Sequence, residues 1–150
     1  MMNDSQLGDL YQEVILDHGR KPRNFGRVEN ANATAEGFNP LCGDKITVQV
    51  IIENDRVTDV HFVGAGCAIA MASASLMTES LKGKTRQEVE QMFQCFHDLL
   101  TTDKTESPEL GKLTVFSGVR EYPMRVKCAT LAWHTLRAAL KNPGEHVSTE

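Results

Sequence analysis

The sequence predicts an α+β domain in which a small antiparallel sheet of about three strands is covered on one face by helices. Two observations favour this class. Alternating apolar residues indicate a hairpin in the first half of the chain, and helical periodicity occurs on both sides of that hairpin. The 150 residues contain no repeat and no linker-like segment, so we expect a single domain over 1–150.

The first element is expected to be a helix that ends near Lys21-Pro22, because proline disfavours helix in the residue before it. Its apolar residues recur at helical spacing: Leu7, Leu10, Tyr11, Val14 and Ile15. An irregular stretch follows, with an edge strand predicted near 32–38.

The hairpin comes next. Ile46, Val48 and Val50 alternate with polar residues, Asn54-Asp55 marks the turn, and the chain returns over 57–63. After Gly64-Ala65-Gly66, small residues dominate the run from Cys67 to Leu81. That composition suits a closely packed helix better than a strand.

Two more helices are predicted. Thr85 and Glu88 form a capping-box pattern that opens the first of them. Its apolar face comprises Val89, Met92, Phe93, Phe96 and Leu100. We expect a loop over 101–107, a short helical turn over 108–115, and a last helix that starts near Pro123 and stops at Asn142-Pro143-Gly144.

Composition narrows the range of partners. The net charge is -4 and the isoelectric point is about 5.7, which argues against nucleic acid or an anionic membrane as the main partner, because both need clustered basic charge. No apolar run approaches the roughly 18 residues of a membrane span, and the N-terminus lacks the apolar core of a secretory signal. We therefore expect a cytoplasmic protein with reduced thiols.

Three of the four cysteines lie where predicted elements meet: Cys42, Cys67 and Cys128. A lone cysteine is more often a core residue than a ligand. Three at glycine- or proline-flanked junctions, with Asp44 two residues after the first, favour metal binding or thiol chemistry instead. Cys95 lies on the flank of a helix stripe, and we interpret it as structural.

Four segments together carry a resemblance to a known family: 10–18, Asn39-Pro40-Leu41-Cys42-Gly43-Asp44, 64–69 with Ser73 and Ser75 behind it, and 125–133. On these segments the chain resembles the IscU/NifU N-terminal family of iron–sulfur assembly proteins, and within it the SufU-like branch. Scaffolds of the IscU type carry a histidine immediately before the last cysteine, where this chain has Lys127. Proteins of the SufU-like branch also carry an insertion between the second and third site cysteines; Cys67 and Cys128 are 61 positions apart, long enough to hold it, and we expect the segment 90–113 to supply it.

The resemblance implies a zinc-dependent sulfurtransferase. Such a protein accepts persulfide sulfur from a cysteine desulfurase of the SufS type and passes it toward the Suf scaffold. Carried over by position, the residues holding zinc would be Cys42, Asp44, Cys67 and Cys128. Cys42 would accept the persulfide, and Arg125 and Lys127 would lie near the docking surface.

Zinc accepts thiolate and carboxylate ligands, and these four against Zn²⁺ sum to a charge of -2. Arg125 and Lys127 could offset that charge in part, although both also suit a solvated helix start. A metal-bound thiolate is a poor nucleophile. We therefore infer that Cys42 is freed only when the docked partner supplies a replacement ligand, most simply a histidine.

Two other functions stay open. The first is a scaffold on which a [2Fe–2S] cluster is built, since thiolates suit iron as well as zinc. The second is a zinc-stapled structural domain with no turnover. Lys127 in place of histidine favours zinc and sulfur transfer over the scaffold.

Overall fold

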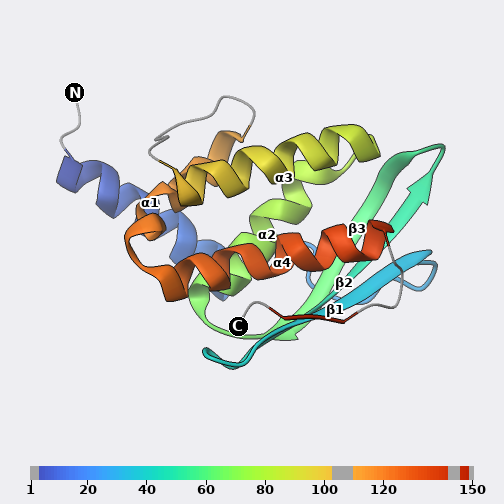
Figure 1. Cartoon of the computed structure of the whole chain (residues 1–150), viewed down its shortest axis with the longest axis horizontal. Coiled ribbons are helices and arrows are strands. Elements are labelled where there is room, and N and C mark those ends of the chain that lie inside the picture. Colours follow the sequence, from blue (N-terminus) through green and yellow to red (C-terminus); the bar gives the residue numbers. More distant parts are fainter. Residues whose placement is uncertain (1–3, 103–109, 142–145, 149–150) are drawn as a thin grey trace.

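The structure, a computed structural model, describes residues 4–102, 110–141 and 146–148. Figure 1 shows a helical layer packed on one face of a twisted sheet. The predicted α+β class is therefore confirmed. No helix among the described residues is long and apolar enough to cross a membrane.

The sheet has the strand order β3-β2-β1-β4. The hairpin strands β2 (Asp44–Glu53) and β3 (Arg56–Ala65) pair antiparallel, as does β1 (Ala33–Asn39) with β2. Asn54 and Asp55 both have positive φ angles, which gives the two-residue turn a twist that matches the strands. The predicted hairpin and its turn are confirmed.

A short fourth strand lies beyond the three predicted ones. Strand β4 (His146–Ser148) runs parallel to β1 and pairs with residues 36–38. The prediction of β1 as an edge strand is wrong over these residues, because β4 occupies that side. On the opposite side of the sheet, the amide of Gly26 donates to the carbonyl of Phe62, and the amide of Phe62 donates to the carbonyl of Asn24.

Alternation along β2 decides which face the helices cover. Ile46, Val48 and Val50 are fully buried, while Lys45, which points to the opposite face of the strand, is exposed. Helix α4 (Pro123–Lys141) lies against β1 and β2, and α2 (Ala68–Leu81) lies against β3 (Figure 1).

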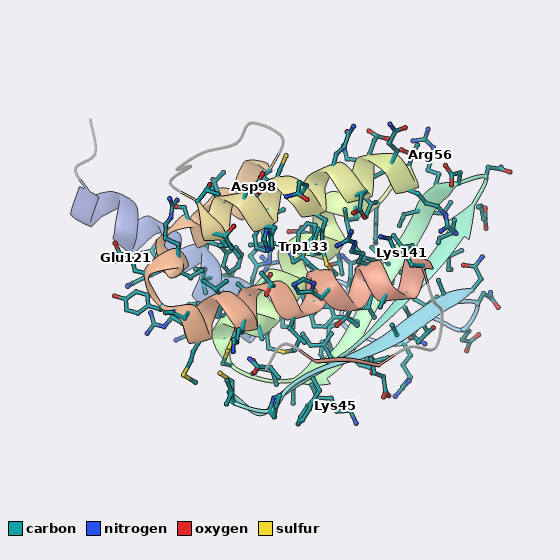
Figure 2. The ribbon with its side chains drawn as sticks, viewed as in Figure 1. Lys45, Arg56, Asp98, Glu121, Trp133 and Lys141 are labelled. Atoms are coloured by element: carbon teal, nitrogen blue, oxygen red, sulfur yellow. The ribbon has the colours of Figure 1, made fainter. Side chains whose placement is uncertain are left out.

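Helix α1 (Asp4–Arg20) ends just before Pro22, as predicted, and packs on α2. Of its predicted stripe, Val14 and Ile15 pack against the core, and the three residues before position 12 lie outside the described side chains. Helix α3 (Arg86–Thr101) has the predicted capping box at Thr85 and Glu88, and all five residues of its predicted face are buried. Figure 2 shows Trp133 of α4 within the helical layer, where its ring stacks on Phe96 with centroids 4.8 Å apart.

The segment before α4 differs from the prediction. In place of a short turn over 108–115, an 11-residue 3₁₀ helix η1 spans Gly111–Glu121. Runs of 3₁₀ helix this long are uncommon, and this one is held by burial of Leu113, Phe116 and Val119 beneath the other helices. Of the loop predicted over 101–107, Thr101 instead belongs to α3, and residues 103–107 lie outside the described residues.

Candidate metal centre

Three chain segments that are distant in the sequence meet at one end of the sheet. Cys42 lies in the turn between β1 and β2, Cys67 immediately precedes α2, and Cys128 lies in the second turn of α4. The Sγ atom of Cys42, a carboxylate oxygen of Asp44 and the Sγ atom of Cys128 all lie within 4.8 Å of one another. The structure thus brings three of the four predicted ligands into reach of a single ion.

The fourth predicted ligand, Cys67, is tied to the same group through Asp44. The amide of Cys67 donates to Asp44 Oδ1 at 2.8 Å, and the Sγ of Cys67 lies 3.9 Å from Asp44 Oδ2. The same sulfur accepts from the amide of Ala70 at 3.4 Å, so Cys67 is also the N-cap of α2. Its sulfur is not within 4.8 Å of all three others.

Gly66 makes the contact between Asp44 and the start of α2 possible. A side-chain carbon at Gly66 would lie 2.6 Å from Asp44 Oδ1, closer than nonbonded atoms approach. The glycine therefore lets the carboxylate reach the Cys67 amide.

Asn39 is a residue of this site that the sequence analysis left without a role. It is fully buried, and its Nδ2 lies 3.5 Å from both Asp44 Oδ2 and the Sγ of Cys128. Its Oδ1 is buried with no partner among the described residues. The residue lies on the helix-facing side of β1, the side that the burial alternation of that strand defines. No signal in the sequence indicated this role, because it depends on contact with Cys128, 89 positions away.

Burial sets the electrostatics of the centre. Asp44 is fully buried, and within the described part of the chain no lysine or arginine forms an ion pair with it. Burial is also the main reason why the pKa of the Cys128 thiol is raised, followed by its contacts with Cys42 and Asp44. A buried carboxylate with only neutral donors, beside two thiols, fits a divalent cation that supplies the missing positive charge.

The three cysteines open onto a groove of about 880 Å³. Its other walls come from α1, η1 and the start of α4: Gln12, Ile15, Leu16, Val115, Gly118, Val119, Tyr122, Met124 and Arg125, with Ala68 and Ile69 of α2. Leu16, Tyr122 and Met124 are each about half exposed, at 44%, 49% and 51%. The thiols therefore lie at the base of a groove with an apolar rim.

The two predicted basic residues lie differently. The guanidinium of Arg125 lies 4.5 Å above the ring of Tyr122, and Arg125 lines the groove. Lys127 is half-buried, and it is not among the described residues that line the groove. Cys95 lies on α3, where it lines a small separate pocket, in keeping with a role outside the centre.

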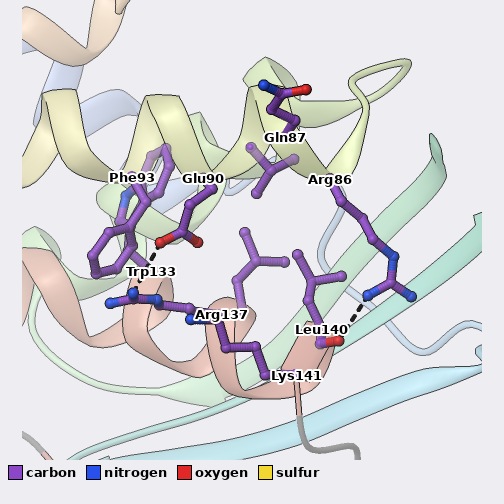
Figure 3. Close-up of a pocket in the computed structure, with 10 residues that line it drawn as sticks. Arg86, Gln87, Glu90, Phe93, Trp133, Arg137, Leu140 and Lys141 are labelled. Atoms are coloured by element: carbon purple, nitrogen blue, oxygen red, sulfur yellow. Dashed lines mark hydrogen bonds and ion pairs between the residues drawn. The ribbon is translucent and has the colours of Figure 1, made fainter. Parts of the chain in front are cut away.

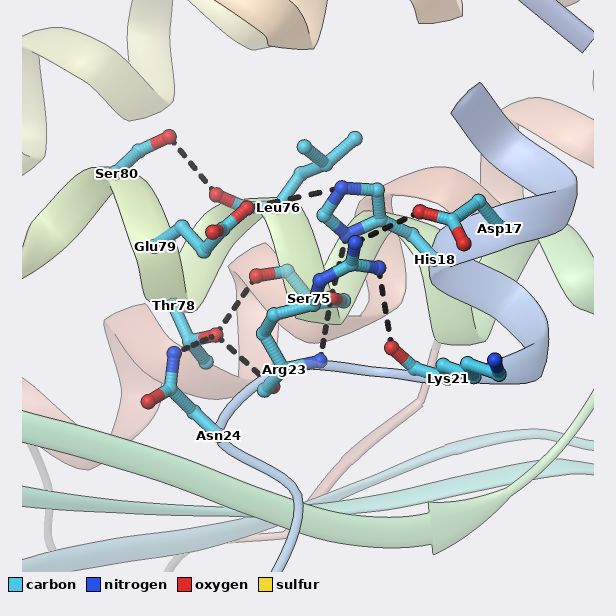
Figure 4. Close-up of polar contacts among 10 residues, drawn as sticks. All are labelled: Asp17, His18, Lys21, Arg23, Asn24, Ser75, Leu76, Thr78, Glu79 and Ser80. Atoms are coloured by element: carbon cyan, nitrogen blue, oxygen red, sulfur yellow. Dashed lines mark hydrogen bonds and ion pairs between the residues drawn. The ribbon is translucent and has the colours of Figure 1, made fainter. Parts of the chain in front are cut away.

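A polar cluster fastens α1 to the helix that Cys67 begins (Figure 4). His18 is 3% exposed, and its Nδ1 shares a 2.7 Å hydrogen bond with Ser75 Oγ, which also accepts from the Arg23 amide at 2.8 Å. Burial lowers the pKa of His18. Arg23 and Lys112 lower it further, and Glu79 acts in the opposite sense. This cluster holds one wall of the groove in place.

A second pocket of about 360 Å³ lies between α3 and α4, and none of the three site cysteines lines it (Figure 3). Its floor is apolar, and at its rim Arg137 forms a 2.9 Å ion pair with Glu90 while Arg86 donates to the carbonyl of Leu140. Both arginines that line this pocket therefore already have a partner.

Fold and site together define a small α+β protein in which thiols and a carboxylate that could hold a metal ion meet beside a groove. A family model described as the NifU-like N terminal domain matches residues 10–129. The chain belongs to this family, as its resemblance indicated.

Some relatives of this chain are named as a sulfurtransferase and others as scaffold proteins. The zinc-dependent sulfurtransferase SufU of Bacillus subtilis is 40% identical over 137 residues, which cover 91% of this chain and 92% of that protein. The iron–sulfur cluster assembly scaffold protein IscU of Thermotoga maritima is 40% identical over 135 residues, 88% of this chain and 93% of that protein. A crystal structure from Fervidobacterium islandicum, described as a candidate iron–sulfur cluster assembly scaffold for the SUF system, has a TM-score of 0.81. It is 39% identical and covers 85% of this chain and 94% of the other.

Proposed function

We propose that this protein is a zinc-dependent sulfurtransferase of iron–sulfur cluster assembly. The observation that carries the proposal is the convergence of Cys42, Asp44 and Cys128 within 4.8 Å at the base of a groove. The similarity to the Bacillus subtilis sulfurtransferase supports it. Cys67 would complete the ligand set after a small shift of its side chain toward the other three.

In the proposal, bound zinc holds the thiols as thiolates and keeps them from reacting outside the correct complex. The chain contributes the selection of Cys42 as sulfur acceptor. Cys42 is half-buried in a turn, next to Gly43, which has a φ of 70° and open space around it. Cys67 is committed to capping α2, and Cys128 is 2% exposed within a helix. Cys42 is therefore the thiol that can swing toward an incoming persulfide.

The sulfur donor would be a cysteine desulfurase of the SufS type, and the product would go on to a Suf scaffold. The half-exposed apolar rim of the groove, with Arg125 beside it, suits a protein loop that carries the persulfide. Four free cysteines suit the reduced conditions of the cytoplasm, where we place this activity.

Metal analysis of the purified protein, coupled to a desulfurase assay, tests the proposal. We expect a colourless protein with about one zinc per chain that raises the activity of the desulfurase severalfold, as a matched thiol acceptor does. Cys42→Ala should abolish this rise with the fold intact, and Cys95→Ala, the matched control, should retain it. Mass spectrometry should then find the persulfide on Cys42. An unchanged rise in Cys42→Ala would contradict the proposed acceptor.

The alternative is a scaffold that assembles a [2Fe–2S] cluster on the same residues. The similarity to the Thermotoga maritima scaffold protein favours it, because that protein has the same 40% identity to this chain as the Bacillus subtilis sulfurtransferase. A brown protein that contains iron and labile sulfide as purified would support the scaffold over the sulfur relay.

A further inference from the structure

The thiols of Cys42 and Cys128 are in direct contact. Their Sγ atoms lie 3.1 Å apart, and the thiol of Cys128 is placed as donor toward the sulfur of Cys42. A disulfide bond needs about 1 Å less than this separation. The open turn at Gly43 can supply such a shift, since a side-chain carbon at that glycine would have no atom within 4 Å apart from its chain neighbours.

The two thiols differ in what can reach them. Cys42 lines the groove and is partly exposed, so a sulfur donor from outside meets it first. Cys128 is 2% exposed, and its sulfur contacts Cys42, Asp44, Cys67 and the amide of Asn39. A thiol in this position is screened from outside reagents but lies next to whatever sulfur Cys42 carries. That is the arrangement of a reactive cysteine and a resolving cysteine.

We infer that Cys128 discharges a persulfide on Cys42 as sulfide when neither thiol holds a metal ion. This inference rests on the proposed function, because it takes the Cys42 persulfide as its substrate. It adds a second activity, sulfide release, which needs no outside reductant.

The reaction balances within the pair. The Cys128 sulfur attacks the Cys42 sulfur, the bond from Cys42 to the outer sulfur breaks, and a Cys42–Cys128 disulfide forms. The outer sulfur leaves with the bonding electron pair and takes the proton of the Cys128 thiol, so that one HS⁻ replaces one persulfide anion. The Cys128 sulfur is oxidised and the outer sulfur is reduced.

The other two cysteines are placed less well for this step. The sulfur of Cys67 accepts from the Ala70 amide as the cap of α2, so moving it would uncover the start of that helix. Cys95 lies on α3 and lines a different pocket. The reaction therefore selects one partner and stops after one sulfide per chain, because the disulfide removes the acceptor and two of the metal ligands together.

The experiment uses the full chain, loaded with inorganic polysulfide in the presence of a chelator, desalted, and then followed in time. Free sulfide and disulfide linkage are both measured. The four cysteines lie on separate tryptic peptides: 28–45, 57–82, 87–104 and 128–137. We expect about one sulfide per chain and a linkage of 28–45 to 128–137, as an internal exchange requires. A sample refilled with zinc before polysulfide is added should release far less.

Cys128→Ser should keep the persulfide on Cys42 and release about tenfold less sulfide, because the resolving thiol is gone. Cys95→Ser is the matched control and should behave like the unaltered chain. If Cys128→Ser fails to fold, sulfide release and disulfide linkage in the unaltered chain still test the inference.

Two results would overturn the inference while leaving Cys42 as the acceptor: a persulfide on Cys42 that persists with no linkage, or a linkage of 28–45 to 57–82. If polysulfide instead modifies another cysteine, the proposed acceptor fails. The pair itself is then judged by oxidation with diamide, where linkage of 28–45 to 128–137 supports the resolving contact and its absence refutes it.

Discussion

The two halves of the cysteine site are built from opposite kinds of structure. Cys42 comes from a solvent-facing turn with an unhindered glycine beside it, whereas Cys128 comes from the buried side of a long helix. Asp44 belongs to the fixed half, since it is fully buried and bonded to the start of α2. One site can therefore contain a thiol that is free to leave, on a turn, and groups that stay in place, on a helix and a strand, because their backbones differ in freedom to move.

The largest expected effect is a loss of zinc affinity when a substitution at Gly66 disturbs the contact between Asp44 and the start of α2. In Gly66→Ala the new methyl would lie 2.6 Å from Asp44 Oδ1, so the carboxylate must turn away from the Cys67 amide. We expect zinc affinity to fall about 10- to 100-fold, as for other losses of the groups that orient a metal ligand. Competition with a zinc indicator measures it.

Gly118→Ala is the matched control, because no atom lies within 4 Å of the added methyl and its φ is not positive. An equal loss of zinc affinity in both variants would show that the orientation of Asp44 does not determine how tightly zinc is bound.

The next effect concerns the spacing between the strand that leads to Cys42 and the helix that carries Cys128. A methyl at Gly37 of β1 would overlap the hydroxyl of Thr135 on α4. We expect Gly37→Ala to destabilise the fold by about 1–3 kcal/mol, the usual cost of overpacking a close contact. Urea unfolding measures this, and adding Thr135→Ala should recover part of the loss; no recovery would place the strain elsewhere.

Asn39 contacts both Asp44 and Cys128, so replacing it tests how these two groups are held. Asn39→Ala removes the amide beside Asp44 and Cys128. We expect about a tenfold loss of zinc affinity, near the lower end for a residue that supports metal ligands. Titration calorimetry can detect this, and an unchanged affinity would mean that Asp44 and Cys128 are held without the amide.

The smallest expected effect is a change in the pH dependence of folding stability, caused by His18 beside the groove. Because burial lowers the pKa of His18 in the folded chain, the unfolded chain binds the proton more readily. Stability should therefore be intact above the ordinary histidine pKa, near 6.5, and decline as the pH falls below it, by at most about 1.4 kcal/mol per pH unit. Urea unfolding between pH 7.5 and pH 5 should show a shallower decline in His18→Gln; identical slopes would assign the pH dependence to other groups.

Local patterns predicted most of the fold. The hairpin, the turn at Asn54-Asp55 and the capping box at Thr85 each depend on residues within a few positions of one another, and each is confirmed. Strand β4 and the full length of η1 were not predicted. The first depends on pairing with β1, distant in the sequence, and the second on burial beneath other helices.

The site was predicted differently from the fold. Residue spacing alone left metal binding and thiol chemistry open, and the set of four ligands came from the resemblance. The structure adds what neither could supply: the buried amide of Asn39, the close approach at Gly66 and the apolar groove. All three arise from contacts between elements, so no local pattern in the sequence reports them.

The arrangement at the two sides of the sheet has a consequence for how other proteins can be recognised. Asn24 and Gly26 form backbone hydrogen bonds to Phe62 of β3, and β4 runs along residues 36–38 of β1, so β3 and β1 each have a neighbour at these residues. An incoming chain cannot extend the sheet there by adding a strand of its own. A partner that meets the protein at these residues therefore contacts side chains rather than free backbone groups.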